Sequence, residues 1–154
     1  MSTPSPTGTN APATPKHDFQ PPPLSPADQA TLKVGQRLSE LCGSGKNLDA
    51  IKELYADNAR HIEVMEGPGC PRITEGKATI MERAEKFHKT TTVHAASCGK
   101  PIINGDQFIV PMSLDCTASE GPMAGHRMNM TETALYTVKN GKITEAKFFY
   151  GCGY

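Results

Sequence analysis

The amino-acid sequence predicts one α+β domain in which helices come first and a sheet of long strands follows. Apolar residues recur at helical spacing at Val34, Leu38 and Leu41, whereas after about residue 92 they alternate with polar residues, as in strands. With 154 residues, of which 37% are hydrophobic, the chain can bury one core of ordinary size. The expected order of elements is α-α-β-α-β-β-β-β.

The N-terminal segment differs in composition from the rest of the chain. Eight of the 13 prolines lie at or before residue 26, with Ser, Thr and Gly between them. Such a segment cannot bury enough apolar surface to offset the entropy lost on ordering. We therefore expect residues 1–24 to form a disordered tail and residues 25–154 to form the domain. Its first helix begins at Ser25-Pro26, where Ser25 can cap the helix and Pro26 fits the first turn.

Gly and Asn residues mark the ends of the next elements. Gly43-Ser44-Gly45 ends the first helix, and Asn47 is expected to cap a short second helix. A strand is expected at about residues 59–66, a loop at 67–71 and a third helix at about 76–90.

The chain after the third helix is predicted to consist of strands. A run from Thr92 ends at the turn Asn104-Gly105-Asp106, and alternating apolar residues then predict a strand at 108–116. Pro111 cannot donate a hydrogen bond in a sheet, which implies an edge position or a bulge. The remaining expected elements are a strand over His126–Val138, a tight turn at Asn140-Gly141 and a strand over Ile143–Tyr150.

Charge balance and cysteine spacing limit the classes of partner. Lys plus Arg and Asp plus Glu each number 16, so a formal net charge of +0 gives no electrostatic reason to expect nucleic acid or an anionic membrane. No apolar run approaches the roughly 18 residues of a membrane span, and no secretory signal is expected. Five widely spaced cysteines argue against a disulfide framework and predict reduced thiols in a cytoplasmic protein. The roles of Cys70 and Cys152 stay open.

Six groups of residues, taken in order, carry a resemblance to a known family. They are Gly45–Ile51 with Leu54–Asp57, Val93-His94, Asn104–Phe108, Met128–Glu132, Tyr136–Ile143 and Phe148–Tyr150. Over about residues 30–152, their order and spacing resemble SnoaL-like domains of the nuclear-transport-factor-2-like (NTF2-like, ketosteroid isomerase-like) superfamily. The resemblance implies a cone of curved antiparallel sheet around about three helices, a homodimer, and a pocket whose reaction the fold does not specify.

Glu63 is the first candidate catalytic residue. It falls inside the strand expected at 59–66, where carboxylates are uncommon and costly to bury unpaired. Aligned on Tyr55–Ala59, it matches the general base of ketosteroid isomerase-like members, so the resemblance implies removal of a proton next to a carbonyl. Strand alternation leaves a second possibility open: if Ile62 and Val64 face the core, Glu63 faces solvent.

Glu132 and His94 complete the catalytic candidates. The resemblance makes Glu132 the counterpart of the late-strand acid of the isomerases. Otherwise it pairs with a base, for which Arg127, Lys147 and His126 are candidates. Two carboxylates in one cavity would titrate apart, leaving one as acid and one as base. His94 could shuttle a proton or donate a hydrogen bond, although a structural role is the more common one for such a histidine.

Further residues could line the pocket. His61 shares a strand face with Glu63 and could pair with it, methionines adapt well to hydrophobic ligands, and the last strand supplies aromatic rings. Each could equally be an ordinary core residue. The candidate ligand-binding residues are His61, Met112, Met130, Phe148 and Tyr150.

These observations favour a small-molecule enzyme of the isomerase, cyclase or dehydratase kind that uses carboxylate acid/base chemistry in an apolar pocket. Steroid isomerase activity is not expected, because the first helix lacks the oxyanion-hole tyrosine of that family. No CxxC, HxxxH or HExxH spacing occurs, so we expect neither a metal nor an organic cofactor. Two alternatives stay open: a non-catalytic binding module for a small hydrophobic ligand, and a homodimeric association domain. The positions of Glu63 and Glu132 relative to the cavity distinguish an enzyme from a binding module.

Overall fold

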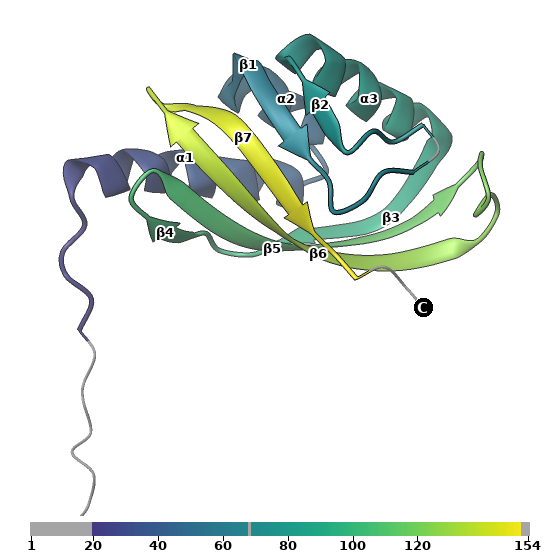
Figure 1. Ribbon diagram of the computed structural model, residues 1–154. Helices are drawn as coiled ribbons and strands as arrows, with labels where there is room; N and C mark the ends of the chain where they lie inside the picture. Colours follow the sequence, from purple (N-terminus) through teal and green to yellow (C-terminus); the bar gives the residue numbers. More distant parts are fainter. Residues whose placement is uncertain (1–19, 68, 152–154) are drawn as a thin grey trace, which may run out of the picture.

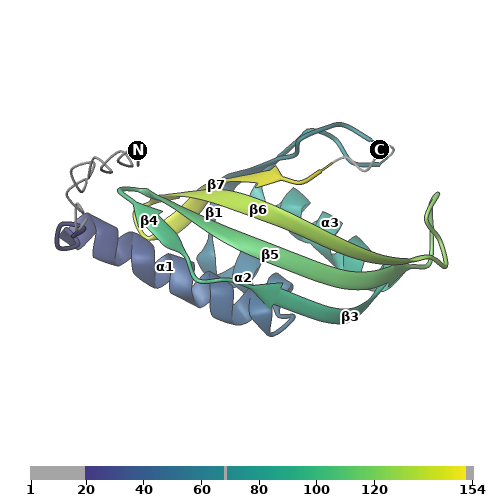
Figure 2. The same cartoon turned by 90° about the horizontal axis from the view of Figure 1, so that it is seen from below.

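The computed structural model describes residues 20–67 and 69–151 and confirms the predicted α+β class. Three helices lie on the concave side of one curved, seven-stranded sheet that does not close into a barrel (Figure 1 and Figure 2). The helices are α1 (Pro26–Gly43), α2 (Asn47–Leu54) and α3 (Lys77–Thr90). The strands are β1 (Tyr55–Ile62), β2 (Ile73–Glu75), β3 (Thr91–Cys98), β4 (Ile102–Asn104), β5 (Gln107–Ala118), β6 (Arg127–Lys139) and β7 (Lys142–Phe149).

The predicted tail lies mostly outside the described residues. Of residues 1–24, only 20–24 are described, and these are in neither helix nor strand. Cys152 also lies outside the described part of the chain. Within that part, no helix combines the length and the apolar character needed to cross a bilayer.

Helix α1 is capped by a side chain at its start, and a tight connection joins its end to α2. Helix α1 begins with a capping box, in which Ser25 Oγ accepts from the Asp28 N–H at 3.1 Å and the Asp28 carboxylate accepts from the Ser25 N–H at 3.0 Å. The expectation that Asn47 caps α2 is wrong: Asn47 is its first residue, and Lys46 precedes it without a side-chain cap. The Lys46 N–H instead bonds the Leu41 carbonyl at 2.8 Å, so the residue before α2 also satisfies a carbonyl in the last turn of α1.

Strand β1 follows α2 directly and ends earlier than its predicted span of 59–66. It runs from Tyr55 to Ile62, so Glu63 lies one residue beyond the strand and not at its centre. The pairing of β1 with β2 stops at Ile62, after which one more bond joins the Glu63 N–H to the Arg72 carbonyl at 2.8 Å. The start at Tyr55 depends on a parallel pairing with β7, which no local pattern could reveal.

The sheet has the order β2-β1-β7-β6-β5-β3, with β4 beside β5. It is mixed, because β1 and β7 run parallel while all other paired strands are antiparallel. Strands β2 and β4 were not predicted as separate elements. Each has only three residues, which is too short to display a recognisable alternation.

Pro111 lies within β5, a strand that has partners on both sides. On one side the partner changes from β3 to β4, and the Gly99 N–H bonds the Pro111 carbonyl at 2.8 Å where β3 has just ended. The N and C=O of a residue in an antiparallel strand point the same way, so the missing N–H faces this break in the ladder. Neither predicted alternative, an edge position or a bulge, is found, because Pro111 pairs with Thr133 of β6 in an unbroken register. An interruption of the strand on the other side accommodates the proline.

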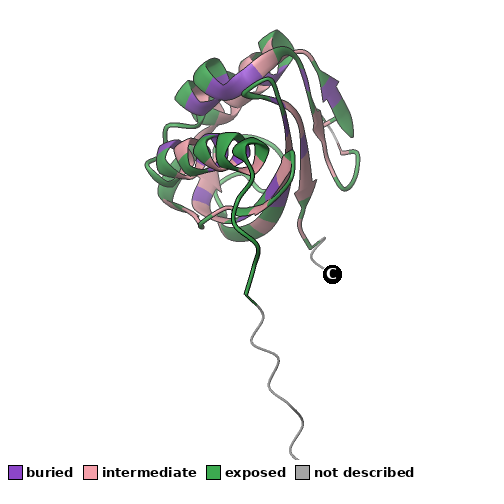
Figure 3. Cartoon of the chain, turned by 90° about the vertical axis from the view of Figure 1, so that its left-hand side faces the viewer, coloured by how far each residue is buried: buried purple, intermediate pink, exposed green. Residues whose placement is uncertain are grey.

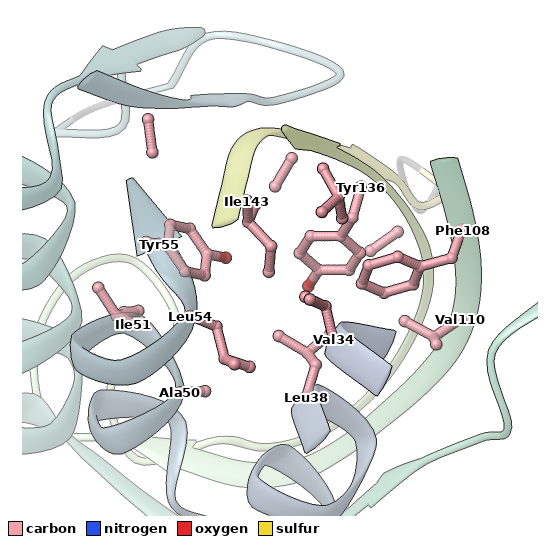
Figure 4. Close-up of a cluster of buried hydrophobic side chains, with 14 of the residues drawn as sticks. Val34, Leu38, Ala50, Ile51, Leu54, Tyr55, Phe108, Val110, Tyr136 and Ile143 are labelled. Atoms are coloured by element: carbon pink, nitrogen blue, oxygen red, sulfur yellow. The ribbon is translucent and has the colours of Figure 1, made fainter. Parts of the chain in front are cut away.

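The hydrophobic core fills the space between the helices and the sheet. Buried residues lie on the inward faces of these elements, and exposed ones cover the outside (Figure 3). Phe108 and Tyr136 stack with ring centroids 4.9 Å apart, and Leu38 of α1 is 1% exposed. The hydroxyls of Tyr55 and Tyr136 point toward each other from opposite sides of the core (Figure 4). The core therefore contains polar atoms, and both tyrosines line a cavity between the helices and the sheet.

Replacing Phe108, which is 1% exposed, tests this packing. Phe108→Ala should lower the free energy of unfolding by about 3–5 kcal/mol, because it leaves a cavity beside the Tyr136 ring. Ile102→Ala, at a residue that is 71% exposed, should change it by less than about 0.5 kcal/mol. Urea unfolding followed by circular dichroism measures both variants, and equal losses would contradict this description of the core.

Candidate functional site

Two adjoining cavities open between the helices and the concave face of the sheet. The inner cavity, of about 240 Å³, reaches core residues of α1, α2 and α3 and the inward faces of β1, β5, β6 and β7. The outer cavity, of about 700 Å³, extends over β3, β5 and β6 toward Tyr150. Together they have the size of a small-molecule site. The residues that line both are Cys42, Asn47, Glu63, Phe87, Met112 and Glu132.

Glu63 lines both cavities because the chain continues past the end of β1 on the side of the helices. Its Oε2 accepts a hydrogen bond from the Tyr150 hydroxyl at 3.1 Å. Val64 and Met65, the next two residues, are 40% and 47% exposed, so the chain turns outward immediately after Glu63. The carboxylate is thus held at the junction of the two cavities by a residue that follows β7.

Glu132 reaches the same region from β6. It stands opposite Met112 of β5, and both lie on the concave face. Burial raises the pKa of its carboxyl, and the negative charge of Glu63 raises it further. Two bases that the sequence offered as partners pair elsewhere: Arg127 with Asp115 at 2.6 Å, and Lys147 with Glu145 at 3.1 Å. Among the described residues, Glu132 forms no ion pair, so its environment favours the protonated form.

His61 faces the inner cavity from β1 and is not bonded to Glu63. Its Nε2 lies 3.1 Å from the Tyr55 hydroxyl, and its ring packs edge-on against Phe148 with centroids 4.9 Å apart. Burial, and to a lesser extent the positive charge of Arg83, lowers the pKa of His61 to about 4. Burial also raises the pKa of Tyr55. At neutral pH His61 and Tyr55 are therefore both neutral hydrogen-bonding groups.

The other predicted site residues divide between the cavity and the surface. Met112 and Phe148 line the inner cavity, and Met112, Met130 and Tyr150 line the outer one. His94 is the exception: it is exposed on β3, outside both cavities, and its Nε2 lies 2.8 Å from Thr117 Oγ1. Strand β3 turns this side chain away from the helices, so a role for His94 in the cavity has no geometric support.

Some cavity residues were not singled out from the sequence. Arg83 lines the inner cavity from α3, and Tyr55 and Tyr136 supply two buried hydroxyls. The prediction of a third helix at about 76–90 did not identify Arg83, because a long charged side chain on a helix is usually taken to be solvent-exposed. Tyr136 shares the alternating face of Glu132, which was the available signal.

Among the described residues, two cysteines, Cys42 and Cys70, line the cavities. Burial raises the pKa of the Cys42 thiol to about 12, so this cavity residue stays a protonated thiol at neutral pH. Cys70 lines the outer cavity, and its Sγ accepts a hydrogen bond from Arg83 at 3.1 Å. In this part of the chain, no three His, Cys, Asp or Glu residues are grouped so as to hold a metal ion.

Comparison with known proteins relates the whole domain to one family. A family model described as the SnoaL-like domain matches residues 29–150. A solved structure from Mesorhizobium loti, provisionally named a SnoaL-like polyketide cyclase, is 36% identical with a TM-score of 0.70, over 77% of this chain and 97% of that chain. Among curated proteins, none matches significantly.

More distant solved structures share the fold. A protein from Jannaschia sp. CCS1, also provisionally named a SnoaL-like polyketide cyclase, has a TM-score of 0.64 at 17% identity, over 84% of this chain and 90% of that chain. An epoxide hydrolase from M. tuberculosis, named as LEH-like, has a TM-score of 0.61 at 10% identity, over 82% and 86% of the two chains. At these identities the likeness is one of architecture, that of the NTF2-like α+β cone.

The half-buried His61 should make stability depend on pH. Its folded pKa of about 4 lies below its ordinary value of 6.5, so the associated stability is complete above pH 6.5 and is lost as the pH falls toward 4. His61→Gln, which cannot ionise, should remove about 2–4 kcal/mol of this pH dependence.

Urea unfolding between pH 4 and pH 7 measures the effect as the difference between the wild type and the variant. The comparison with the variant is needed because Glu132, whose pKa is raised in the folded protein, changes the stability in the opposite direction. Ionising Glu132 as the pH rises destabilises the fold. His94→Gln, at an exposed histidine, is the matched control and should follow the wild type. Identical pH profiles for all three proteins would show that the His61 ring is not held neutral.

Proposed function

The chain belongs to the SnoaL-like domain family, and we propose that it is a cofactor-independent enzyme that moves a proton on a small, largely apolar substrate. One observation carries the proposal: Glu63 and Glu132 face the same cavity in environments that differ. Burial and the charge of Glu63 keep Glu132 toward its protonated form, while a tyrosine hydroxyl bonds the Glu63 carboxylate. Where the surroundings of two carboxyl groups in one site differ in this way, one can serve as the base and the other as the acid.

In the proposed reaction, Glu63 is the general base. Its carboxylate removes a proton from a carbon next to a carbonyl group, and Tyr150 fixes the orientation of the accepting oxygen. The apolar wall supplied by Met112, Phe87 and Phe148 excludes water from the substrate. Isomerisation, aldol-type cyclisation and dehydration all contain this proton transfer, so the site accounts for the class of reaction without selecting one member.

Glu132 is the proposed acid. In its protonated form it donates a hydrogen bond, and then a proton, to the oxygen on which negative charge develops when Glu63 takes the substrate proton. Glu132 has no ion-pair partner among the described residues, which supports this role because its proton is free to point into the cavity. The neutral His61 and Tyr55 pair lies deeper in the inner cavity and positions the substrate.

Hydrogen–deuterium exchange on a simple ketone tests the base. The apolar bicyclic ketone 2-tetralone is incubated with the protein in D₂O, and loss of its α-proton signals is followed by NMR. Glu63→Gln should slow the catalysed exchange by about 10²–10⁴-fold, because the amide cannot accept the proton. Asp57→Asn, at an exposed acid of β1, is the matched control and should leave the rate unchanged.

The exchange assay also separates the alternatives. A Glu63→Gln rate equal to that of the wild type would remove Glu63 from the mechanism. Binding of 2-tetralone without any exchange by the wild type would favour the non-catalytic binding module, which uses the same cavity without a base.

The pH dependence of the same reaction tests the acid. If Glu132 must be protonated, the exchange rate falls as the pH rises through its raised pKa. Glu132→Gln should lower the exchange rate and abolish its decrease with rising pH, because the amide does not ionise. If the exchange rate of Glu132→Gln still fell with rising pH as in the wild type, the titrating group would be another residue.

A further inference from the structure

Arg83 stands out among the residues of the inner cavity by its charge. It projects from α3, is half-buried, and is the only Lys or Arg among the described residues that line either cavity. Its positive charge acts on His61, which places it near the pair formed by His61 and Tyr55. The cavity therefore combines apolar walls with one fixed cation.

The bonds that Arg83 makes leave its charge without a counter-ion. Its terminal nitrogens donate to Thr74 Oγ1 and to Cys70 Sγ, both neutral acceptors. Among the described residues, no carboxylate lies within ion-pair distance of it, whereas Arg37, Arg60 and Arg127 each pair with one. A guanidinium group has five N–H donors, so three stay available for a ligand.

The position of Arg83 is fixed from the sheet. Thr74, which is 3% exposed, stands directly opposite His61 in the pairing of β2 with β1. The bond from Arg83 to Thr74 thus attaches the guanidinium to the same strand pair that carries His61. A planar donor group held in this way is suited to a planar anion, since Arg and carboxylate groups match in a bidentate geometry.

We propose that Arg83 binds a carboxylate group of the substrate, so that the substrate is a small, largely apolar carboxylic acid that also carries the reacting carbonyl. The proposal rests on the proposed function, because it names the substrate class for the same cavity. The acid group lies at α3 beside His61, and the reacting carbon lies toward Glu63 and Glu132, where the two cavities meet. Arg83 then offsets the repulsion between the bound acid and Glu63.

Ligand binding tests this assignment without any turnover. The protein contains no tryptophan, so the fluorescence of naphthalene-2-carboxylate can be read without indole background. The wild type should bind this acid at least about tenfold more tightly than its methyl ester, since the charge-assisted bonds are lost in the ester. Equal affinities, or failure of the wild type to bind the acid, would overturn the proposal.

Variants attribute the preference to Arg83. Arg83→Gln should weaken binding of the acid by about tenfold to a hundredfold and binding of the ester by less than about threefold. Arg83→Lys keeps the charge but not the planar donor group, so its affinity for the acid should lie between those of the wild type and Arg83→Gln. Arg60→Gln, at an exposed arginine paired with Glu145, is the matched control and should bind as the wild type does.

Two further arms complete the test. Thermal unfolding of each variant shows whether it is folded; if Arg83→Gln is not, the comparison of acid with ester in the wild type and in Arg83→Lys decides. The carboxylate assignment would be overturned if folded Arg83→Gln lost affinity equally for the acid and the ester. It would also be overturned if the wild type bound 2-naphthyl phosphate more tightly than the carboxylate.

Glu63→Gln separates this proposal from the proposed function. It should keep the preference for the acid while losing proton exchange. If the wild type binds the acid through Arg83 but catalyses no proton exchange, the anion site is supported and the proposed enzyme is rejected. If the wild type catalyses exchange but does not prefer the acid to its ester, the proposed enzyme is supported and the anion site is rejected.

Discussion

The pairing of β5 with β6 is the constraint on which the rest of the site depends. It joins Gln107–Thr117 to Arg127–Thr137 in one unbroken register, whereas the pairings of β3 with β5, β6 with β7 and β1 with β7 all contain a shift. Side chains alternate along a strand, so this register decides that Met112 and Glu132 face the helices. A slip of β6 by one residue would turn Glu132 outward and bring Thr133 into the cavity.

The concave face then controls the charge of what it encloses. Apolar surroundings disfavour the ionised form of any group placed among them, which is why His61 is neutral and Glu132 is held toward its protonated form. Glu63 and Arg83 are anchored by neutral partners, Tyr150 and Thr74. Because these anchors are in place before a ligand arrives, the polar groups need little rearrangement when charge develops, which is the condition for electrostatic catalysis.

The fold also explains why the site is assembled from remote segments. Glu63 follows β1, Glu132 lies in the middle of β6 and Arg83 lies on α3, yet all three line the inner cavity. The parallel pairing of β1 with β7 brings the end of β1 close to Tyr150, and the short strand β2 supplies the acceptor for Arg83. Two details that sequence patterns describe poorly, a parallel pair and a three-residue strand, thus determine the polar contacts of the site.

The sequence by itself determined the class of fold, the three helices and the long strands. Caps such as Ser25 with Asp28, glycine-containing turns and hydrophobic periodicity act over a few residues, so they can be read without a partner. Only the tertiary structure decided that β1 ends before Glu63, that Pro111 faces a break in the ladder, that His94 lies outside the cavity and that Arg83 lies within it. These outcomes depend on which strand lies beside which, and on the burial that follows. Both are set by contacts between residues far apart in the chain, for which one sequence carries no local signal.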